Sequence, residues 1–242
     1  MPDKGANHST EIEQRLQAVV ARVRAAERRF GREPGSVQIL PVSKTRPAVD
    51  IARVAAAGFS AFGESYLQEA EAKMDALAAL QLCWHFIGPL QSNKTRPIAE
   101  RFHWVHSVSR VKIARRLSEQ RPADLPPLNI CLQLNVSGEA AKAGVTQAEL
   151  PALAEQVAAL PRLQLRGLMA IPAATTDFDA QRAAFGIVRE AFNSLPATLD
   201  IRGGTWDTLS MGMSGDLEAA IAEGSTLVRV GTDIFGPRNK AH

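Results

Sequence analysis

Short apolar runs alternate with amphipathic segments along most of this chain. Eight apolar runs have the length of buried strands, and they are predicted at Val37–Val42, Phe59–Gly63, Trp84–Gly88, Trp104–Val108, Leu128–Val136, Leu165–Ile171, Thr208–Met211 and Leu227–Gly231. Segments with apolar residues at helical spacing lie between them, and helices are predicted at Pro47–Ala57, Tyr66–Leu80, Lys94–Phe102, Arg110–Glu119, Gln147–Leu160, Phe178–Leu195 and Asp216–Ala222. Strands that alternate with helices in this way are typical of a parallel (β/α)8 barrel.

The part of the chain before the first predicted strand supplies an extra helix. Residues 1–10 are expected to form a flexible tail, and Thr10 with Glu13 three residues later matches the capping box that opens a helix. No long helix is predicted after the last strand, so we expect the N-terminal helix to fill that gap in the outer ring. Residues 11–242 would then form one α/β domain, a single TIM barrel.

An open doubly wound sheet is the alternative arrangement for the same order of elements. Such sheets usually carry a glycine-rich turn after their first strand. Here the first strand ends in Ser43, Lys44 and Thr45, with no glycine among them. The closed barrel is therefore favoured.

Composition and charge exclude several classes of protein. The 242-residue chain has 45% hydrophobic and 22% charged residues, as globular proteins do, and a net charge of only +3. The densest basic stretch, residues 22–32, has Phe30 as its single aromatic residue and so lacks aromatic interleaving, which favours a solvated helix face over a nucleic-acid site. No apolar run is long enough for a membrane span and no apolar signal segment opens the chain. We therefore expect a cytoplasmic protein in which Cys83 and Cys131 stay reduced.

Lys44 stands at the end of the first predicted strand. The active sites of α/β barrels lie where strands end and the following loops begin. A lysine can form an imine once its pKa is lowered, whereas an arginine cannot. Lys44 is therefore a candidate for covalent chemistry, although a solvated charge is the commoner fate of a single lysine at a strand end.

The loops after strands seven and eight carry the features of a phosphate site, and this fold usually holds a phosphate there. Ser214 lies between Gly212 and Gly215, just before a predicted helix whose free N–H groups favour a phosphate. A helix cap is the simpler role for Ser214, and the two roles are compatible. Gly231 and Thr232 would add N–H and hydroxyl donors to the same pocket.

Two polar residues lie within predicted strands. Arg229 shares a face with Gly231, so it points into the barrel if Gly231 faces the mouth, where it would need an anion or a strong acceptor. An outward arginine paired with a helix carboxylate is the alternative. His85 is a candidate base or polar contact, although an isolated histidine in an apolar strand is more often a core residue. His103 and His106 have no third ligand nearby, so no metal site is expected, and no Walker or nucleophile-elbow motif is present.

Six motifs stand in an order that resembles one known family. They are Val42–Thr45, Phe62–Tyr66, Trp84–Lys94, Arg166–Ile171, Leu209–Ser214 and Val228–Gly236. Together they closely resemble the YggS/PROSC family of pyridoxal 5'-phosphate (PLP) homeostasis proteins, over about residues 12–238. The resemblance implies a fold like the N-terminal barrel of alanine racemase, of the fold type III PLP kind.

The resemblance also implies which residues contact the cofactor. They are Lys44, Met213, Ser214, Arg229, Gly231 and Thr232. From its place in the third predicted strand, His85 is expected to contact the cofactor as well. Lys44 would carry PLP as a Schiff base, and the loops after strands seven and eight would hold its phosphate. Because an arginine keeps its proton, Arg229 would leave the pyridine nitrogen unprotonated and the ring a poor electron sink.

Two departures limit what the resemblance implies. The family usually has asparagine where this chain has Ser65, which puts a direct contact to the cofactor in doubt. Racemase-type enzymes add a β-domain that supplies a second base, and a chain that ends at His242 with a single tyrosine, Tyr66, leaves no sequence for it. We therefore expect a monomeric, non-catalytic PLP carrier whose partners include PLP-dependent apo-enzymes. A PLP-dependent racemase or decarboxylase, and a PLP-independent Schiff-base aldolase, are the alternatives.

Overall fold

Eight parallel strands form one sheet in the computed structural model, which describes residues 4–137, 143–195 and 205–237. The strands are β1 (Gln38–Pro41), β2 (Ala61–Glu64), β3 (Cys83–Phe86), β4 (Trp104–Val108), β5 (Leu128–Leu134), β6 (Leu163–Ala170), β7 (Thr208–Ser210) and β8 (Leu227–Val230). Their order in the sheet is β1-β8-β7-β6-β5-β4-β3-β2. All eight predicted strands are confirmed: β4 has the predicted ends, and the other seven have slightly different ends.

The two end strands of this order, β1 and β2, meet and nearly close the sheet into a barrel. A parallel bridge joins Val42 to Gly63, and the Ser43 amide donates a hydrogen bond to the Gly63 carbonyl at 3.0 Å. This closure confirms the predicted barrel and excludes the open doubly wound sheet.

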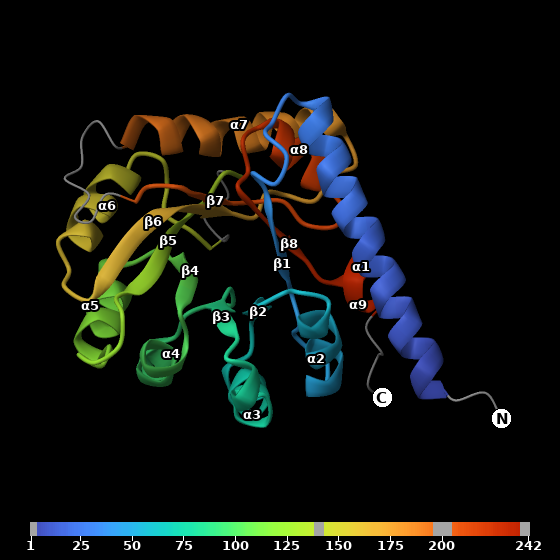
Figure 1. Ribbon diagram of the computed structural model, residues 1–242. Helices are drawn as coiled ribbons and strands as arrows, with labels where there is room; N and C mark the ends of the chain where they lie inside the picture. The colour runs from blue at the N-terminus through green and yellow to red at the C-terminus, as the bar shows by residue number, and fades with distance from the viewer. Residues whose placement is uncertain (1–3, 138–142, 196–204, 238–242) are drawn as a thin grey trace.

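Helices surround the strands, as Figure 1 shows. Those that follow strands are α2 (Ala48–Ala56), α3 (Leu67–Ala76), α4 (Thr95–Arg101), α5 (Val111–Gln120), α6 (Leu150–Ala158), α7 (Phe178–Ser194), α8 (Leu217–Ala222) and the short α9 (Thr232–Phe235). The first seven confirm the predicted helices, and 3-10 turns flank two of them at Ala78–Leu80 and Ser92–Lys94. None of the described helices combines the length and the apolar character needed to cross a membrane.

The N-terminal helix α1 (Lys4–Arg29) packs against α2, α8 and α9 and completes the outer ring beside β1 and β8 (Figure 1). Its predicted place is confirmed. The predicted start is wrong, because the helix already runs through Thr10 from Lys4. A capping box identifies a possible helix start, but extending a formed helix by a further turn costs little free energy.

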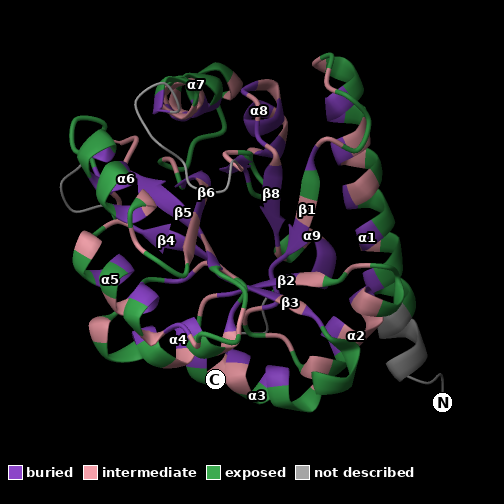
Figure 2. Cartoon of the chain, turned by 60° about the vertical axis from the view of Figure 1, so that its left-hand side comes forward, coloured by how far each residue is buried: buried purple, intermediate pink, exposed green. Residues whose placement is uncertain are grey.

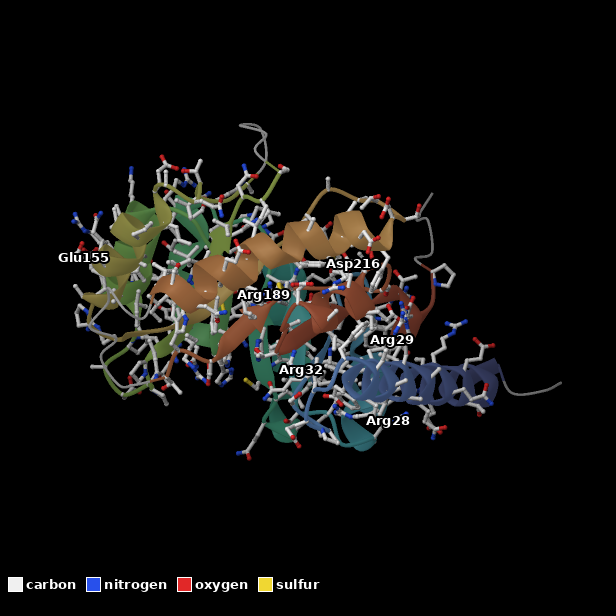
Figure 3. The ribbon with its side chains drawn as sticks, turned by 90° about the horizontal axis from the view of Figure 1, so that it is seen from above. Arg28, Arg29, Arg32, Glu155, Arg189 and Asp216 are labelled. Atoms are coloured by element: carbon white, nitrogen blue, oxygen red, sulfur yellow. The ribbon has the colours of Figure 1, made fainter. Side chains whose placement is uncertain are left out.

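Arginines of the basic stretch, residues 22–32, connect α1 to the C-terminal part of the barrel through hydrogen bonds. Arg22 donates hydrogen bonds to Glu218 and Asp233, and Arg32 donates to the carbonyls of Ile221 and Ser225. In Figure 3, Arg29 and Arg32 mark the end of α1 that lies beside α8. The expectation of a solvated face is therefore wrong for Arg22 and Arg32, which are only partly exposed.

Strand residues alternate between two environments, the barrel interior and the layer between strands and helices. Figure 2 shows that most of the strands are buried, and so are the sides of the helices that face them. On β3, the side chains of Trp84 and Phe86 lie on the side of the strand that faces the helices. The ring centres of Trp84 and Phe62 are 6.1 Å apart. Phe86 packs edge-on against Phe102 at the end of α4, with ring centres 5.3 Å apart. His85 between them faces the barrel interior, where it meets His106. The apolar core thus lies between strands and helices, and polar side chains enter the barrel itself.

Candidate functional site

A cavity of about 230 Å³ opens where the strands end. Its lining comes from the ends of six strands and consists of Val42, Lys44, Arg46, Ser65, Ile87, Ile171, Met213, Ser214, Gly215, Arg229, Gly231 and Thr232. Among the described lining residues the charged side chains are all cationic, namely Lys44, Arg46 and Arg229. The cavity is therefore suited to a small anionic ligand.

Lys44 lies in a turn that is held from several sides. The next residue, Thr45, has a φ of 63°, a left-handed conformation that is strained for a β-branched side chain. The Thr45 amide donates a hydrogen bond to Glu69, and the Ser43 carbonyl accepts one from Lys73 Nζ at 2.8 Å. These bonds fix the backbone on both sides of Lys44 and keep it at the barrel mouth.

The loop after β7 is shaped by a glycine and an aspartate. Gly212 has a φ of 94°, and a Cβ there would come within 2.6 Å of the Ala220 side chain, so the loop needs glycine to pack on α8. Asp216 accepts a hydrogen bond from the Met213 amide at 2.6 Å, and burial raises the pKa of this carboxyl group. The two contacts present Ser214 and Gly215 to the cavity.

Backbone donors face the cavity from two loops. No hydrogen bond between described residues uses the N–H groups of Ser214, Gly215 or Gly231, and all three residues line the cavity. Because backbone donors are rarely left without a partner, these groups are suited to the oxygens of a bound anion. The loops after strands seven and eight, where a phosphate site was predicted, thus contain backbone donors available to an anion.

Arg229 points into the barrel, as the strand alternation allowed. Its side chain is buried and donates to the Ser210 carbonyl at 2.5 Å, to Ser210 Oγ at 2.7 Å and to the Ala170 carbonyl at 2.9 Å. Burial lowers the pKa of Arg229 to about 10, which still leaves the guanidinium charged at neutral pH. The alternative of an outward arginine paired with a helix carboxylate is wrong.

His85 does not line the cavity, unlike the other six residues predicted to contact a cofactor. It faces the interior two residues before Ile87, which does line the cavity, so it lies one layer deeper. His85 instead stacks on Trp104, with ring centres 5.2 Å apart, and contacts His106. Its place in the third strand was predicted, but its depth below the end of that strand was not.

Several lining residues were not expected from the sequence. Arg46 lines the cavity and donates to the carbonyl of Pro237 at 2.8 Å. Ser65, whose contact was in doubt, lines it as well, and Ile87 and Ile171 add apolar surface. Ser65, Ile87 and Ile171 had a signal, since each lies in a recognised motif at the end of a strand.

The chemistry available at the site follows from this lining. Lys44 supplies a primary amine, and the amides of the β7 and β8 loops lie near it because β1 and β8 are neighbours, with Pro41 paired to Val230. Such a cavity can bind a small compound that carries both a carbonyl carbon and an anionic group. His103 and His106, considered as a metal pair, bond to different partners: the Trp84 amide and His85.

Comparisons with known proteins agree with this fold. Residues 14–239 match the family model of the alanine racemase N-terminal domain. The chain is 60% identical over 228 residues to the pyridoxal phosphate homeostasis protein of Pseudomonas aeruginosa, covering 94% of this chain and 96% of the relative. It is 50% identical to the protein of that name from Escherichia coli over 232 residues, covering 95% and 97%. Among solved structures, PipY of Synechococcus elongatus with PLP bound has a TM-score of 0.76 and 38% identity, covering 93% of this chain and 100% of that one.

Proposed function

Since the chain belongs to the pyridoxal phosphate homeostasis proteins and has the N-terminal barrel of alanine racemase, we propose that it binds PLP in the cavity at the barrel mouth and serves PLP homeostasis. The observation that supports this best is the convergence on one cavity of an amine, a buried arginine and backbone donors without partners. When bound, PLP supplies an aldehyde that reacts with amines, and in enzymes an electron sink.

The residues present fit this cofactor group by group. Lys44 Nζ is the amine that would bond covalently to the aldehyde carbon. The N–H groups of Ser214, Gly215 and Gly231 are suited to the phosphate oxygens, with the Thr232 hydroxyl beside them. Arg229 would face the ring nitrogen and donate a hydrogen bond to it without giving up its proton.

We propose further that the protein binds PLP with little or no turnover. Among the described lining residues, Lys44 is the only side chain with an amine that could act as a base, because the two arginines keep their protons. His85, the candidate for a second base, lies below the cavity, and burial lowers its pKa to about 3. A single base beside a ring whose nitrogen stays unprotonated supports a carrier rather than a racemase.

The proposed carrier is a cytoplasmic monomer that passes PLP to apo-enzymes. Exposed apolar side chains in loops after the strands, among them Tyr66, Ile171 and Met213, offer a surface around the mouth for such an acceptor. Both cysteines are free, as expected in a reducing compartment. A mass near 26.1 kDa by light scattering would support the monomer.

The visible absorption of protein-bound PLP tests the function directly. The wild-type protein, mixed with PLP and desalted, should keep an absorption band that Lys44→Ala loses completely. Lys94→Ala is the matched control, because Lys94 is exposed and does not line the cavity. Lys44→Ala should still unfold cooperatively, since a partly exposed residue at the barrel mouth contributes little to the core. Loss of the band in Lys94→Ala, or its survival in Lys44→Ala, would refute the assignment.

The same preparation separates a carrier from an enzyme. The PLP-loaded protein should racemise or decarboxylate amino acids no faster than free PLP, and it should restore activity to a PLP-dependent apo-enzyme. Rapid turnover that disappears in Lys44→Ala would establish the racemase or decarboxylase alternative instead.

A further inference from the structure

A line of hydrogen-bonded polar side chains crosses the barrel interior below the cavity, and we call it the buried polar chain. It runs from Arg229 on β8 to Ser210 on β7, His106 on β4, His85 on β3 and Cys83 at the start of β3. Arg229 Nη1 lies 2.7 Å from Ser210 Oγ, and Ser210 Oγ lies 2.8 Å from His106 Nδ1. His106 Nε2 lies 2.9 Å from His85 Nδ1, and His85 Nε2 lies 3.5 Å from Cys83 Sγ.

The direction of these hydrogen bonds follows from the one member that can only donate. Arg229 has no acceptor, so Ser210 Oγ accepts from it. The Ser210 hydroxyl hydrogen then has one available acceptor among the described residues, His106 Nδ1. His106 therefore carries its hydrogen on Nε2 and donates it to His85 Nδ1. His85 in turn carries its hydrogen on Nε2, facing the Cys83 sulfur.

The opposite direction leaves a buried donor unpaired. If His106 donated from Nδ1, Ser210 would accept two hydrogen bonds and its own hydroxyl hydrogen would have no partner among the described residues. Ser210 and His106 are both fully buried, so that loss would cost about 1–3 kcal/mol. The first direction satisfies every member and is the stable one.

Both histidines stay neutral, as the directed chain requires. Burial lowers the pKa of His85 to about 3. Burial, together with the nearby His85 and Arg229, holds the pKa of His106 well below its usual value. His85 is also fixed in orientation, because its ring stacks on Trp104 with only 5° between the planes. The end of the buried polar chain that is remote from Arg229 is thus held in place by strand residues of the barrel.

We propose that His106 positions Arg229 through Ser210, with His85 fixing the tautomer of His106. Each member turns a lone pair toward the arginine, so the chain stabilises the guanidinium charge and holds it at the cavity floor. Hydrogen bonds aligned head to tail in a low-dielectric interior strengthen one another. For PLP as the ligand, the inference rests on the proposed function: the chain keeps Arg229 aimed at the ring nitrogen as a charged donor.

The tautomers of His85 and His106 test the proposed direction of the hydrogen bonds in the absence of any cofactor. Long-range ¹H–¹⁵N NMR on the ligand-free wild-type protein at neutral pH should show both His85 and His106 neutral, with the hydrogen on Nε2 and the lone pair on Nδ1. In Ser210→Ala the His106 Nδ1 resonance should shift, because it loses its donor. A hydrogen on His106 Nδ1, or a cationic ring, would overturn the proposal.

PLP affinity tests the positioning role. Ser210→Ala and His106→Leu should each weaken PLP binding about tenfold and shift the absorption maximum of the bound cofactor. His106→Asn should bind close to wild type, because Asn Oδ1 takes the place of Nδ1 as the acceptor of the Ser210 hydroxyl. Ser118→Ala is the control for removing a buried hydroxyl: Ser118 lies on α5 and donates to the Pro161 carbonyl. It should leave PLP binding unchanged.

The outcomes separate this inference from the proposed function. If the wild-type protein fails to bind PLP, the function is wrong, and the NMR result still decides the direction of the chain. If the wild type binds PLP and Ser210→Ala binds as tightly as Ser118→Ala, the positioning role is refuted. Equal weakening by His106→Asn and His106→Leu would refute the part played by the Nδ1 lone pair.

Discussion

Lys73 is a buried charge that supports the turn carrying Lys44. It is 5% exposed and donates to Glu64 Oε1 at 2.7 Å, to the Ser43 carbonyl at 2.8 Å and to Glu69. Glu64 is completely buried, and burial raises its pKa although Lys73 opposes the shift. Its second oxygen has no hydrogen-bond partner among the described residues. Lys73 thus compensates a carboxylate that would otherwise be isolated in the core.

Lys73→Met should destabilise the protein by about 3–5 kcal/mol, because it leaves the Glu64 carboxylate buried without its cation. The measurement is urea unfolding at neutral pH. The double variant Lys73→Met with Glu64→Gln removes both charges and should recover much of the lost stability. A double variant less stable than Lys73→Met would contradict this account of the pair.

At the scale of residues, the sequence predicted the surroundings of a side chain better than the residues to which it forms hydrogen bonds. Strand alternation allowed Arg229 to point into the barrel but left an outward side chain open. Its partner Ser210 and the link to His106 were not predicted, because residues 104 positions apart meet only through the register of a closed barrel. His85 was expected to contact the cofactor, and its depth was not predicted, because depth depends on where the strand ends.

The helix α1 completes the ring in place of a helix after β8, and arginines attach it there. Arg22 contacts Glu218 on α8 and Asp233 on α9 with side chains that are about one third exposed. Glu27, fully buried on the same helix, accepts the amide of Val37 at 2.8 Å just before β1. The helix is therefore linked to both ends of the barrel sequence, and its packing supports the β1–β8 neighbours that carry Lys44 and Gly231.

Arg22→Ala should lower the free energy of unfolding by about 1 kcal/mol, the upper range for a partly exposed ion pair. The loss should shrink at high salt, since the contacts are reached by solvent. Thermal unfolding at two ionic strengths measures both effects. Arg28→Ala, at an exposed position on the same helix, is the control, and equal stability of the two variants would show that the arginine contacts do not hold α1.

At the scale of elements, apolar periodicity predicted every described strand and the helices α2 to α8, because burial against the barrel sets both periods, but it did not predict the short α9. The start of α1 was missed by six residues, from Thr10 to Lys4. A capping signal is local, and it competes with the small cost of extending a helix. The anchoring role of Arg22 and Arg32 was also missed, since it depends on α8 and α9 lying beside α1.

For the whole molecule, the number of paired residues differs from one pair of neighbouring strands to another. β5 and β6 are paired along their full length, from Leu128 with Leu163 to Leu134 with Ala170. β1 and β2 are joined by the single bridge between Val42 and Gly63. This β1–β2 seam is next to Lys44, so a thinly paired join of the barrel borders the candidate site. Alternating elements predict a barrel, but they do not show which neighbouring strands share few paired residues.

Hydrogen exchange should therefore be faster at the seam than within β5 and respond there to PLP. In the ligand-free protein the Ser43 amide, bonded across the seam to Gly63, should exchange much faster than the amide of Leu132 within β5. If opening the seam disrupts the cavity, PLP at 100 times its dissociation constant should slow Ser43 exchange up to about 100-fold, because a ligand stabilises the state it binds. Lys44→Ala should abolish this slowing. A Ser43 amide as protected as Leu132 without ligand, or unchanged by PLP in the wild type, would show that the seam and the site are not coupled.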